Sequence, residues 1–237
     1  MAIYDTKIVG KNPVADGTME FLLEKPAALK YRAGQFFDII LTAKPGAEKS
    51  SYVHGFSFAS APCEPNLVAA TRMRGTPFKN TIRDLPIGTP VKIDAVFGSF
   101  TLHKDTKVPA VFIIGGVGIT PVRSIIAQST HDQSGHALTL IYANDTPARA
   151  PYVNDLKGFA KANPNFRFVQ TFTQAPGAAG DEHGRVDAAM IKRHVKDIMA
   201  PIYYLSGPAG MVRATRETLM GMGVDEDNIR TEEFEGY

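Results

Sequence analysis

The sequence has no tryptophan and a single cysteine, Cys63, among its 237 residues. One cysteine excludes both a disulfide framework and an iron–sulfur cluster held by cysteines of this sequence alone. No apolar run approaches the roughly 20 residues that cross a membrane, and the first residues lack the apolar core of a signal peptide. We therefore expect a soluble, cytoplasmic protein that binds no membrane and no metal.

An excess of one charge is also missing. The sequence has 26 basic and 24 acidic residues, which gives a formal net charge of +2. Proteins that bind nucleic acids normally present a basic stripe or patch, so the composition gives no support for nucleic-acid binding. No internal repeat is present either, and we expect a monomer.

Residues 1–104 are rich in short segments that alternate apolar and polar side chains or carry β-branched and aromatic residues, which is typical of strands. Such segments occupy residues 2–9, 18–25, 35–42, 55–60, 66–74 and 90–97. A single stretch in this half, residues 78–85, has the pattern of a helix. The pattern predicts a first domain that is a six-stranded antiparallel β-barrel.

Residues 105–237 change to alternating strands and helices. Strands are expected at 108–116, 136–144, 166–173, 202–207 and 228–234, and helices at 121–129, 153–162, 187–196 and 210–222. Alternation of this kind predicts a second, α/β domain with a five-stranded parallel sheet and helices on both faces. Residues 174–184 are expected to form a surface loop.

Three glycines, Gly115, Gly116 and Gly118, follow the first strand of this second domain. A turn without side chains lets a ligand approach backbone N–H groups, and a helix N-terminus favours a pyrophosphate. Thr120 would cap the next helix, and Pro121 would take its first position. A nucleotide site and a glycine turn that packs a helix against the sheet are both open at this point.

A second small-residue turn, Ser206-Gly207-Pro208, ends another buried strand and precedes another helix. Ligands of open parallel sheets bind at the carboxyl ends of the strands. Two such turns at one edge of a sheet would form a single crevice. Taken alone, this second turn is equally typical of an ordinary helix start.

Seven segments, in order along the chain, resemble motifs of the ferredoxin–NADP⁺ reductase superfamily of flavoproteins. They are YRAGQFF (31–37), HGFSFASAP (54–62), GTPFKNTIRDL (75–85), GSFTL (98–102), GGVGITP (115–121), YLSGPAGMV (204–212) and EEFEGY (232–237). The resemblance implies a barrel that binds flavin, FAD in preference to FMN, and an α/β domain that binds NAD(P)H.

By this resemblance, residues 54–58 align with the family's flavin motif Arg-x-aromatic-Ser. Phe56 would lie against the isoalloxazine ring, Ser57 would place its hydroxyl near flavin N5, and Phe58 would continue the strand along the flavin. The family's arginine is replaced by His54, which carries no fixed charge. We therefore expect a weaker or more pH-dependent contact with the flavin pyrophosphate.

A second phosphate-binding element is implied at the start of the short helix, where Lys79, Asn80 and Thr81 would meet the pyrophosphate. Lys79 is equally typical of a solvated surface lysine. Arg72 or Arg74, on the adjacent strand, could supply the charge of the missing arginine.

In the second domain the resemblance assigns nucleotide binding to the two small-residue turns. The residues carried over are Gly116, Gly118, Thr120, Pro121, Ser206, Gly207 and Pro208. Glu233 and Phe234 match the terminal strand that faces the flavin, and Tyr237 either stacks on the flavin or is a free end. Ser57, Ser206 and Glu233 are the candidate catalytic residues.

Specificity between NADH and NADPH depends on the residues that meet the adenosine 2′ position. Asp145 favours NADH there, whereas Arg149, Arg213 and Arg216 would favour NADPH. The expected activity is hydride transfer from NAD(P)H to FAD, then electron transfer to a separate soluble acceptor such as ferredoxin, flavodoxin or an oxygenase component. A reductase of free flavin or ferric chelates, and a flavin- and nucleotide-binding redox regulator without turnover, are the alternatives.

Overall fold

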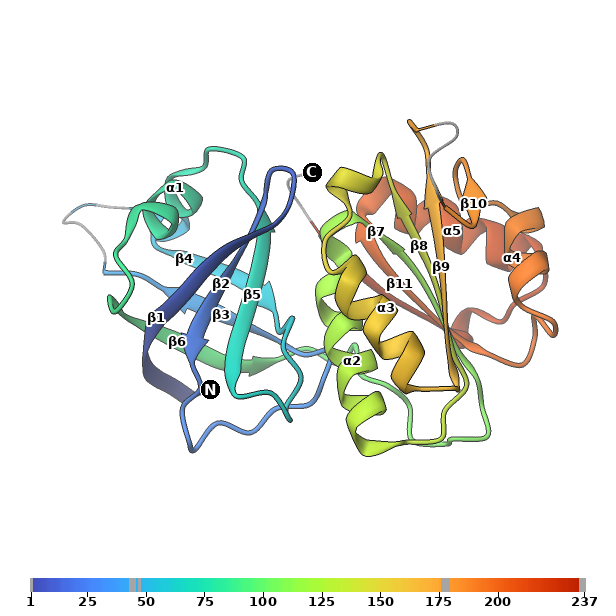
Figure 1. Ribbon diagram of the computed structural model, residues 1–237, viewed down its shortest axis with the longest axis horizontal. Coiled ribbons are helices and arrows are strands. Elements are labelled where there is room, and N and C mark those ends of the chain that lie inside the picture. The colour runs from blue at the N-terminus through green and yellow to red at the C-terminus, as the bar shows by residue number, and fades with distance from the viewer. Residues whose placement is uncertain (1, 43–45, 47, 176–179, 235–237) are drawn as a thin grey trace.

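The computed structural model describes residues 2–42, 46, 48–175 and 180–234, which form two lobes side by side (Figure 1). The last strand of the first lobe is Pro90–Phe97 and the first strand of the second is Ala110–Gly115, so the boundary expected at residue 104 lies in the connection between them. Tyr237, which the sequence left between two roles, lies outside the described residues.

The first lobe is an antiparallel sheet of six strands in the order β4-β3-β6-β1-β2-β5, as the alternating segments predicted. The strands are β1 (Ala2–Ala15), β2 (Thr18–Glu24), β3 (Phe36–Ile40), β4 (Val53–Ser57), β5 (Asn66–Arg72) and β6 (Pro90–Phe97). Just beyond β4, the Ala59 N–H donates to the Val68 carbonyl of β5 at 2.8 Å, which brings the two edge strands together into a barrel. Alternate residues such as Phe37 and Ile39 are fully buried inside it. α1 (Pro77–Asp84) lies at one end of the barrel (Figure 1).

The second lobe is a parallel sheet in the order β10-β9-β8-β7-β11-β12. Its strands are β7 (Ala110–Gly115), β8 (Leu138–Asn144), β9 (Phe166–Phe172), β10 (Glu182–His183), β11 (Ile202–Pro208) and β12 (Ile229–Phe234). The sheet therefore has six strands rather than the expected five. The extra strand, β10, lies within the segment expected to be a loop, and its two residues are too few to show a periodic pattern.

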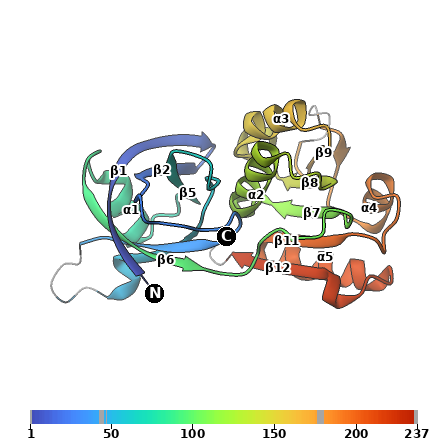
Figure 2. The same ribbon diagram turned by 90° about the horizontal axis from the view of Figure 1, so that it is seen from below.

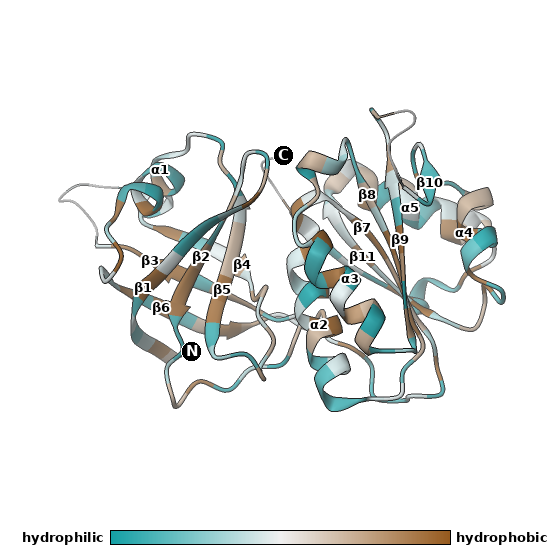
Figure 3. Cartoon of the chain, in the orientation of Figure 1, coloured by the Kyte–Doolittle hydropathy of each residue, from teal (hydrophilic) through white to brown (hydrophobic). Residues whose placement is uncertain are grey.

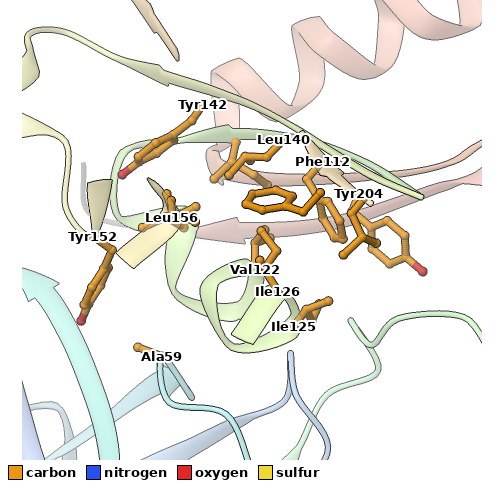
Figure 4. Close-up of a cluster of buried hydrophobic side chains, with 14 of the residues drawn as sticks. Ala59, Phe112, Val122, Ile125, Ile126, Leu140, Tyr142, Tyr152, Leu156 and Tyr204 are labelled. Atoms are coloured by element: carbon orange, nitrogen blue, oxygen red, sulfur yellow. The ribbon is translucent and has the colours of Figure 1, made fainter. Parts of the chain in front are cut away.

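Helices cover both faces of this sheet (Figure 2). They are α2 (Ile119–Asp132), α3 (Val153–Ala162), α4 (Ala188–His194) and α5 (Ala209–Gly221), with short 3-10 turns at Lys49–Ser51, Gly116–Gly118, Pro147–Arg149 and Glu226–Asn228. One face packs on α2 and α3 through a cluster that includes Phe112, Ile126 and Leu156 (Figure 4). The other face packs on α4 and α5 through Ile191 and Leu219. Hydrophobic residues are concentrated in the central strands of the sheet. Hydrophilic residues are concentrated on the helix faces that point away from the sheet (Figure 3).

The described part of the chain has neither a membrane-spanning helix nor a cluster of metal-binding side chains. None of its helices is long and apolar enough to cross a membrane. No group of three or more histidine, cysteine, aspartate or glutamate residues within it could hold a metal ion.

Candidate active site at the domain junction

The two small-residue turns lie at the same edge of the parallel sheet and touch each other. β7 and β11 are neighbouring parallel strands, so the turns that follow them meet. A Cβ atom added to Gly118 would lie 2.6 Å from the Gly207 backbone nitrogen, and Gly207 itself has φ +144°. Gly116 has φ +53°, in the left-handed region. Glycine is therefore required on both sides of this contact, and the single crevice inferred from the sequence is confirmed.

The helix after the first turn begins differently from the sequence prediction. Gly118 is the N-cap of α2 and Ile119 is its first residue, so Pro121 takes the third helical position. Thr120 does not cap the helix, because its hydroxyl donates to the Val117 carbonyl at 3.1 Å and the residue is almost fully buried. The 3-10 turn over Gly116–Gly118 starts the helical path earlier than the cap preference of threonine suggested.

A cleft of about 880 Å³ opens between the lobes at these turns. Its lining combines backbone of both turns with side chains from the second lobe and from the end of β5. The residues are Arg72, Arg74, Gly115, Gly116, Ala143, Asn144, Asp145, Arg149, Thr173, Gln174, Gly184, Arg185, Val186, Pro208, Gly210, Met211, Ala214 and Thr215. A cleft of this size at the carboxyl ends of parallel strands is typical of a nucleotide site.

Charges in this cleft are mostly positive. Arg72 and Arg74 reach it from the barrel, and Arg149 and Arg185 from the second lobe. Asp145 lies in the same cleft, and its carboxylate forms an ion pair of 2.6 Å with Arg149. The arginines make the cleft complementary to a polyanion, and the charge of Asp145 is partly neutralised by its partner.

Three polar side chains from three separate strands come together beside the cleft. Ser57 ends β4, and in the second sheet Ser206 of β11 pairs in register with Glu232 of β12. Burial raises the pKa of the Glu232 carboxyl to about 7, although a side-chain hydrogen bond from Ser57 opposes the rise. In the described structure, Ser206 Oγ and Glu232 Oε2 are buried without a hydrogen-bond partner. Unpartnered buried oxygens are rare and indicate a place where a ligand can supply the missing bond.

His54 lies farther along β4, against α1. Its ring is stacked 4.8 Å from that of Phe56 and lies 5.3 Å from that of Phe78, and Nδ1 lies 2.8 Å from the Gly55 carbonyl oxygen. Burial lowers the pKa of His54, and the nearby charge of Lys79 lowers it further. The imidazole is therefore neutral at pH 7, and it has a lysine beside it.

The two phenylalanines of the flavin segment point into the barrel core. Phe58 is completely buried and its ring stacks between those of Tyr31, at 3.9 Å, and Phe37, at 4.3 Å. Phe56 is 5% exposed and packs against Phe78. In this arrangement the backbone of the segment, rather than these two rings, is the part that a cofactor could touch.

The start of α1 already uses some of the donors expected to bind phosphate. The Thr76 hydroxyl accepts from the Lys79 N–H at 3.4 Å, and the Thr76 carbonyl accepts from the Asn80 N–H at 2.9 Å. Lys79 is buried rather than solvated, and burial lowers its pKa. Thr81 is exposed on the helix. A phosphate here would have to rely on side chains more than on free N–H groups.

Comparison with known proteins agrees with this geometry. Residues 112–217 match a family model described as an oxidoreductase NAD-binding domain. The chain is 27% identical over 218 residues to the reductase component of propane 2-monooxygenase from Rhodococcus jostii, which covers 89% of this chain and 57% of the relative. It is 24% identical to ferredoxin–NADP reductase B of Sorangium cellulosum over 98% of both chains.

The fold comparison extends over both lobes. The crystal structure of a ferredoxin NADP⁺ reductase from Neisseria gonorrhoeae aligns with a TM-score of 0.82, at 20% sequence identity, over 98% of each chain. In sequence and in fold, the chain is therefore similar to ferredoxin–NADP⁺ reductases and to the reductase components of oxygenases. It spans 57–61% of the length of the oxygenase reductase components that it matches.

The structure separates the two adjacent glutamates of the last strand. Side chains alternate along β12, so Glu232 and Phe234 share one face and Glu233 lies on the other. Glu233 is exposed and lines a separate hollow together with Thr231 and Arg213. The structure therefore does not bring Glu233 to Ser57 and Ser206; the carboxyl that it brings there is Glu232.

Glu232 is the site residue that sequence reasoning missed. The signal that could have found it is the alternation of side chains along a strand. A residue that pairs in register with Ser206 of the parallel neighbour β11 points to the same side of the sheet as Ser206. The resemblance to the family motif points instead to the adjacent residue, Glu233.

Proposed function

We propose that this chain is a flavoprotein oxidoreductase that binds FAD along β4 of the barrel and NAD(P)H in the cleft of the second lobe. The observation that carries the proposal is the meeting of Ser57, Ser206 and Glu232 at the junction between these two sites, with two buried oxygens left unpartnered. The related structure from Neisseria gonorrhoeae is described with bound FAD and NADP. Residues 1–104 would form the flavin domain and residues 105–237 the nucleotide domain.

The residues present fit both cofactors. For the nucleotide, the close contact of Gly118 with Gly207 brings the two turns together, and Gly116 and Pro208 from these turns line the cleft, where Arg72 and Arg185 supply positive charge. For the flavin pyrophosphate, the fit rests on Lys79 and the neutral His54, with Asn80 and Thr81 beside them on α1.

The chemistry would be divided between cofactors and protein. Bound FAD supplies an acceptor for the hydride of NAD(P)H and releases electrons singly to the next carrier. Ser57 would donate its hydroxyl hydrogen bond at the flavin edge, and Ser206 would hold the nicotinamide through Oγ. Glu232, with a pKa raised to about 7, can hold or release a proton at Oε2 near neutral pH. The junction between the lobes would exclude water and fix the relative orientation of the two rings.

The proposed acceptor is a separate soluble carrier: ferredoxin, flavodoxin or an oxygenase component. The named relatives that support it are reductase components of oxygenases and a ferredoxin–NADP reductase. The single cysteine supports it too, because the sequence itself cannot ligate an iron–sulfur cluster with cysteines. We also propose that the protein is monomeric and cytoplasmic. Because of Asp145, we propose NADH as its preferred hydride donor.

The test is an anaerobic titration of the FAD-loaded protein, followed by visible absorbance while NADH or NADPH is added to separate samples. We expect rapid bleaching by at least one of them, followed by reoxidation with ferredoxin, flavodoxin or an oxygenase component. Reoxidation by free flavin or ferric chelates alone would instead identify a flavin or ferric reductase. A protein that takes up no FAD, or whose bound FAD is not reduced, would overturn the proposal in favour of a regulatory role.

A matched pair of variants tests the site itself. Glu232→Gln should slow flavin reduction and remove its pH dependence near pH 7, because the titrating group is lost. Glu233→Gln changes the adjacent carboxyl on the opposite face of the strand. In this variant, we expect flavin to be reduced at the same rate as in the unmodified protein. Equal effects of the two substitutions would show that the assigned carboxyl is wrong.

A further inference from the structure

The side chain of Arg123, in the second turn of α2, spans the junction between the two lobes. It forms an ion pair with Glu64, on the loop after β4, and donates to the Ala59 carbonyl at 3.2 Å. On the other side its guanidinium donates twice to Asp155 of α3, at 2.7 and 3.0 Å. Ala59 and Glu64 belong to the barrel and Asp155 to the second lobe, so a single side chain binds both.

Neighbouring contacts fix this guanidinium in place. Its side chain is 12% exposed, and its central carbon lies 5.7 Å from the ring centroid of Tyr152 and 5.5 Å from that of Phe159. The next residue, Ser124, is fully buried and donates its hydroxyl to the Ser60 carbonyl at 2.6 Å. Two consecutive side chains of α2 therefore bind two consecutive carbonyls of the barrel segment that contains Ala59, which reaches the same apolar cluster as α2 (Figure 4).

These contacts connect the two proposed cofactor sites through short stretches of chain. Ala59 follows Ser57 by two residues, at the end of the flavin strand. Arg123 follows Gly118 by five residues, on the helix that the nucleotide turn begins. Arg123 itself is not among the residues that line the cleft. It can therefore set the position of both sites without touching either ligand.

We propose that Arg123 is a positioning residue for hydride transfer: it holds the flavin strand and the nucleotide helix at the separation and tilt that the reaction needs. This inference rests on the proposed function. Transfer between two stacked rings is sensitive to geometry, and a misplacement of about 1 Å can cost on the order of 100-fold in rate. Without Arg123, the carboxylates of Glu64 and Asp155 would face each other across the junction with no cation between them, and their repulsion would loosen the junction at this point.

Arg123→Met removes the cation and keeps much of the volume, and Arg123→Lys keeps the charge but not the planar fork that serves three acceptors. The control is Arg193→Met, which removes a guanidinium that pairs with Glu182 inside the second lobe. We expect anaerobic stopped-flow at saturating NAD(P)H to show flavin reduction at least about tenfold slower in Arg123→Met and about threefold slower in Arg123→Lys. Arg193→Met should match the unmodified protein.

Further readouts separate positioning from a general loss of stability. The dissociation constants for FAD and for oxidised nucleotide should change less than about threefold, whereas the long-wavelength charge-transfer absorbance of the stacked rings should fall. In the flavin-free protein, hydrogen exchange should accelerate in residues 59–64 of Arg123→Met and stay unchanged in Arg193→Met. If Arg123→Met does not fold, the same measurements on Arg123→Lys decide the question.

The outcomes distinguish this inference from the function on which it rests. If the unmodified protein fails to reduce its flavin with NAD(P)H, the proposed function fails. If the unmodified protein reduces it, and both Arg123 variants keep the same saturated rate and the same charge-transfer absorbance, the positioning role is overturned while the proposed function stands.

Discussion

Replacing Glu232 with glutamine should stabilise the protein in a way that depends on pH. Glu232 is half-buried at the junction with its Oε2 shielded from solvent, and this burial raises the pKa of its carboxyl from the ordinary value of 4.5 to about 7. Glutamine has nearly the same shape and stays neutral at every pH. The substitution therefore removes the cost of ionising a buried group while it keeps the packing of β12.

The sign and size follow from the two pKa values. A carboxyl with a raised pKa in the folded state contributes its full stability below the unfolded pKa, near pH 4.5, and loses it as the pH rises through about 7. At about 1.4 kcal/mol per pKa unit, the loss amounts to about 3 kcal/mol above pH 7. The free energy of unfolding of the Glu232→Gln variant should thus be higher than that of the unmodified protein by about 3 kcal/mol at pH 8 and by about 1 kcal/mol at pH 5.

Urea unfolding of the flavin-free protein at pH 5, 6.5 and 8 measures this difference, with Glu233→Gln as the control. Glu233 is the adjacent, exposed residue of the same strand, so its substitution should give a small difference that does not grow with pH. A stability difference for Glu232→Gln that stays constant between pH 5 and 8, or the same rise in the control, would refute the reasoning from burial.

Four further substitutions test other parts of the structure. Gly118→Ala should abolish nucleotide binding in equilibrium titrations and cost about 1–3 kcal/mol of stability, because its Cβ would lie 2.6 Å from backbone of the neighbouring turn. Gly158→Ala, in α3 with no atom within 4 Å of its Cβ, should instead stabilise by about 0.5–1 kcal/mol. His54→Arg should tighten FAD binding about tenfold at pH 8 by adding a fixed charge. The pKa of His54 lies below the ordinary histidine value of 6.5, so the imidazole becomes positively charged only below that pH. The affinity of the unmodified protein for FAD should therefore rise as the pH falls below 6.5. Asp145→Asn should raise affinity for NADP⁺ relative to NAD⁺ by about tenfold in paired titrations, since it frees Arg149 from a 2.6 Å ion pair.

Much of the fold could be predicted because it depends on local patterns. Strands with one buried face alternate in polarity, and strands buried on both faces are continuously apolar, so the change from barrel to parallel sheet is visible in the sequence. The glycine turns were predictable for a similar reason, since a close approach such as that of Gly118 to Gly207 tolerates no side chain. The two-residue strand β10 carries no such pattern and depends on its neighbour β9.

The parts of the site that could not be predicted depend on contacts between distant segments. Thr120 has the ideal chemistry for a cap, but the preceding 3-10 turn moves the helix start and leaves its hydroxyl facing Val117. The choice of Glu232 over Glu233 is fixed by the register of β12 on β11. Arg123 follows a recognisable motif, yet its partners lie 59 and 32 residues away in the sequence.

The ionisation of Glu232 and the contacts of Arg123 should be coupled, because both depend on the closed junction. The hydrogen bond from Ser57 to Glu232 crosses from the barrel to the second sheet, as the contacts of Arg123 do. If loss of Arg123 lets the lobes separate, water reaches Glu232 and its pKa falls back toward the ordinary value. The stability gained by Glu232→Gln at pH 8 should then shrink from about 3 kcal/mol to less than about 1 kcal/mol in an Arg123→Met background. A double-mutant cycle in urea at pH 8 measures this. A gain that is the same in both backgrounds would mean that the two groups act independently, and that Arg123 does not hold the junction closed around Glu232.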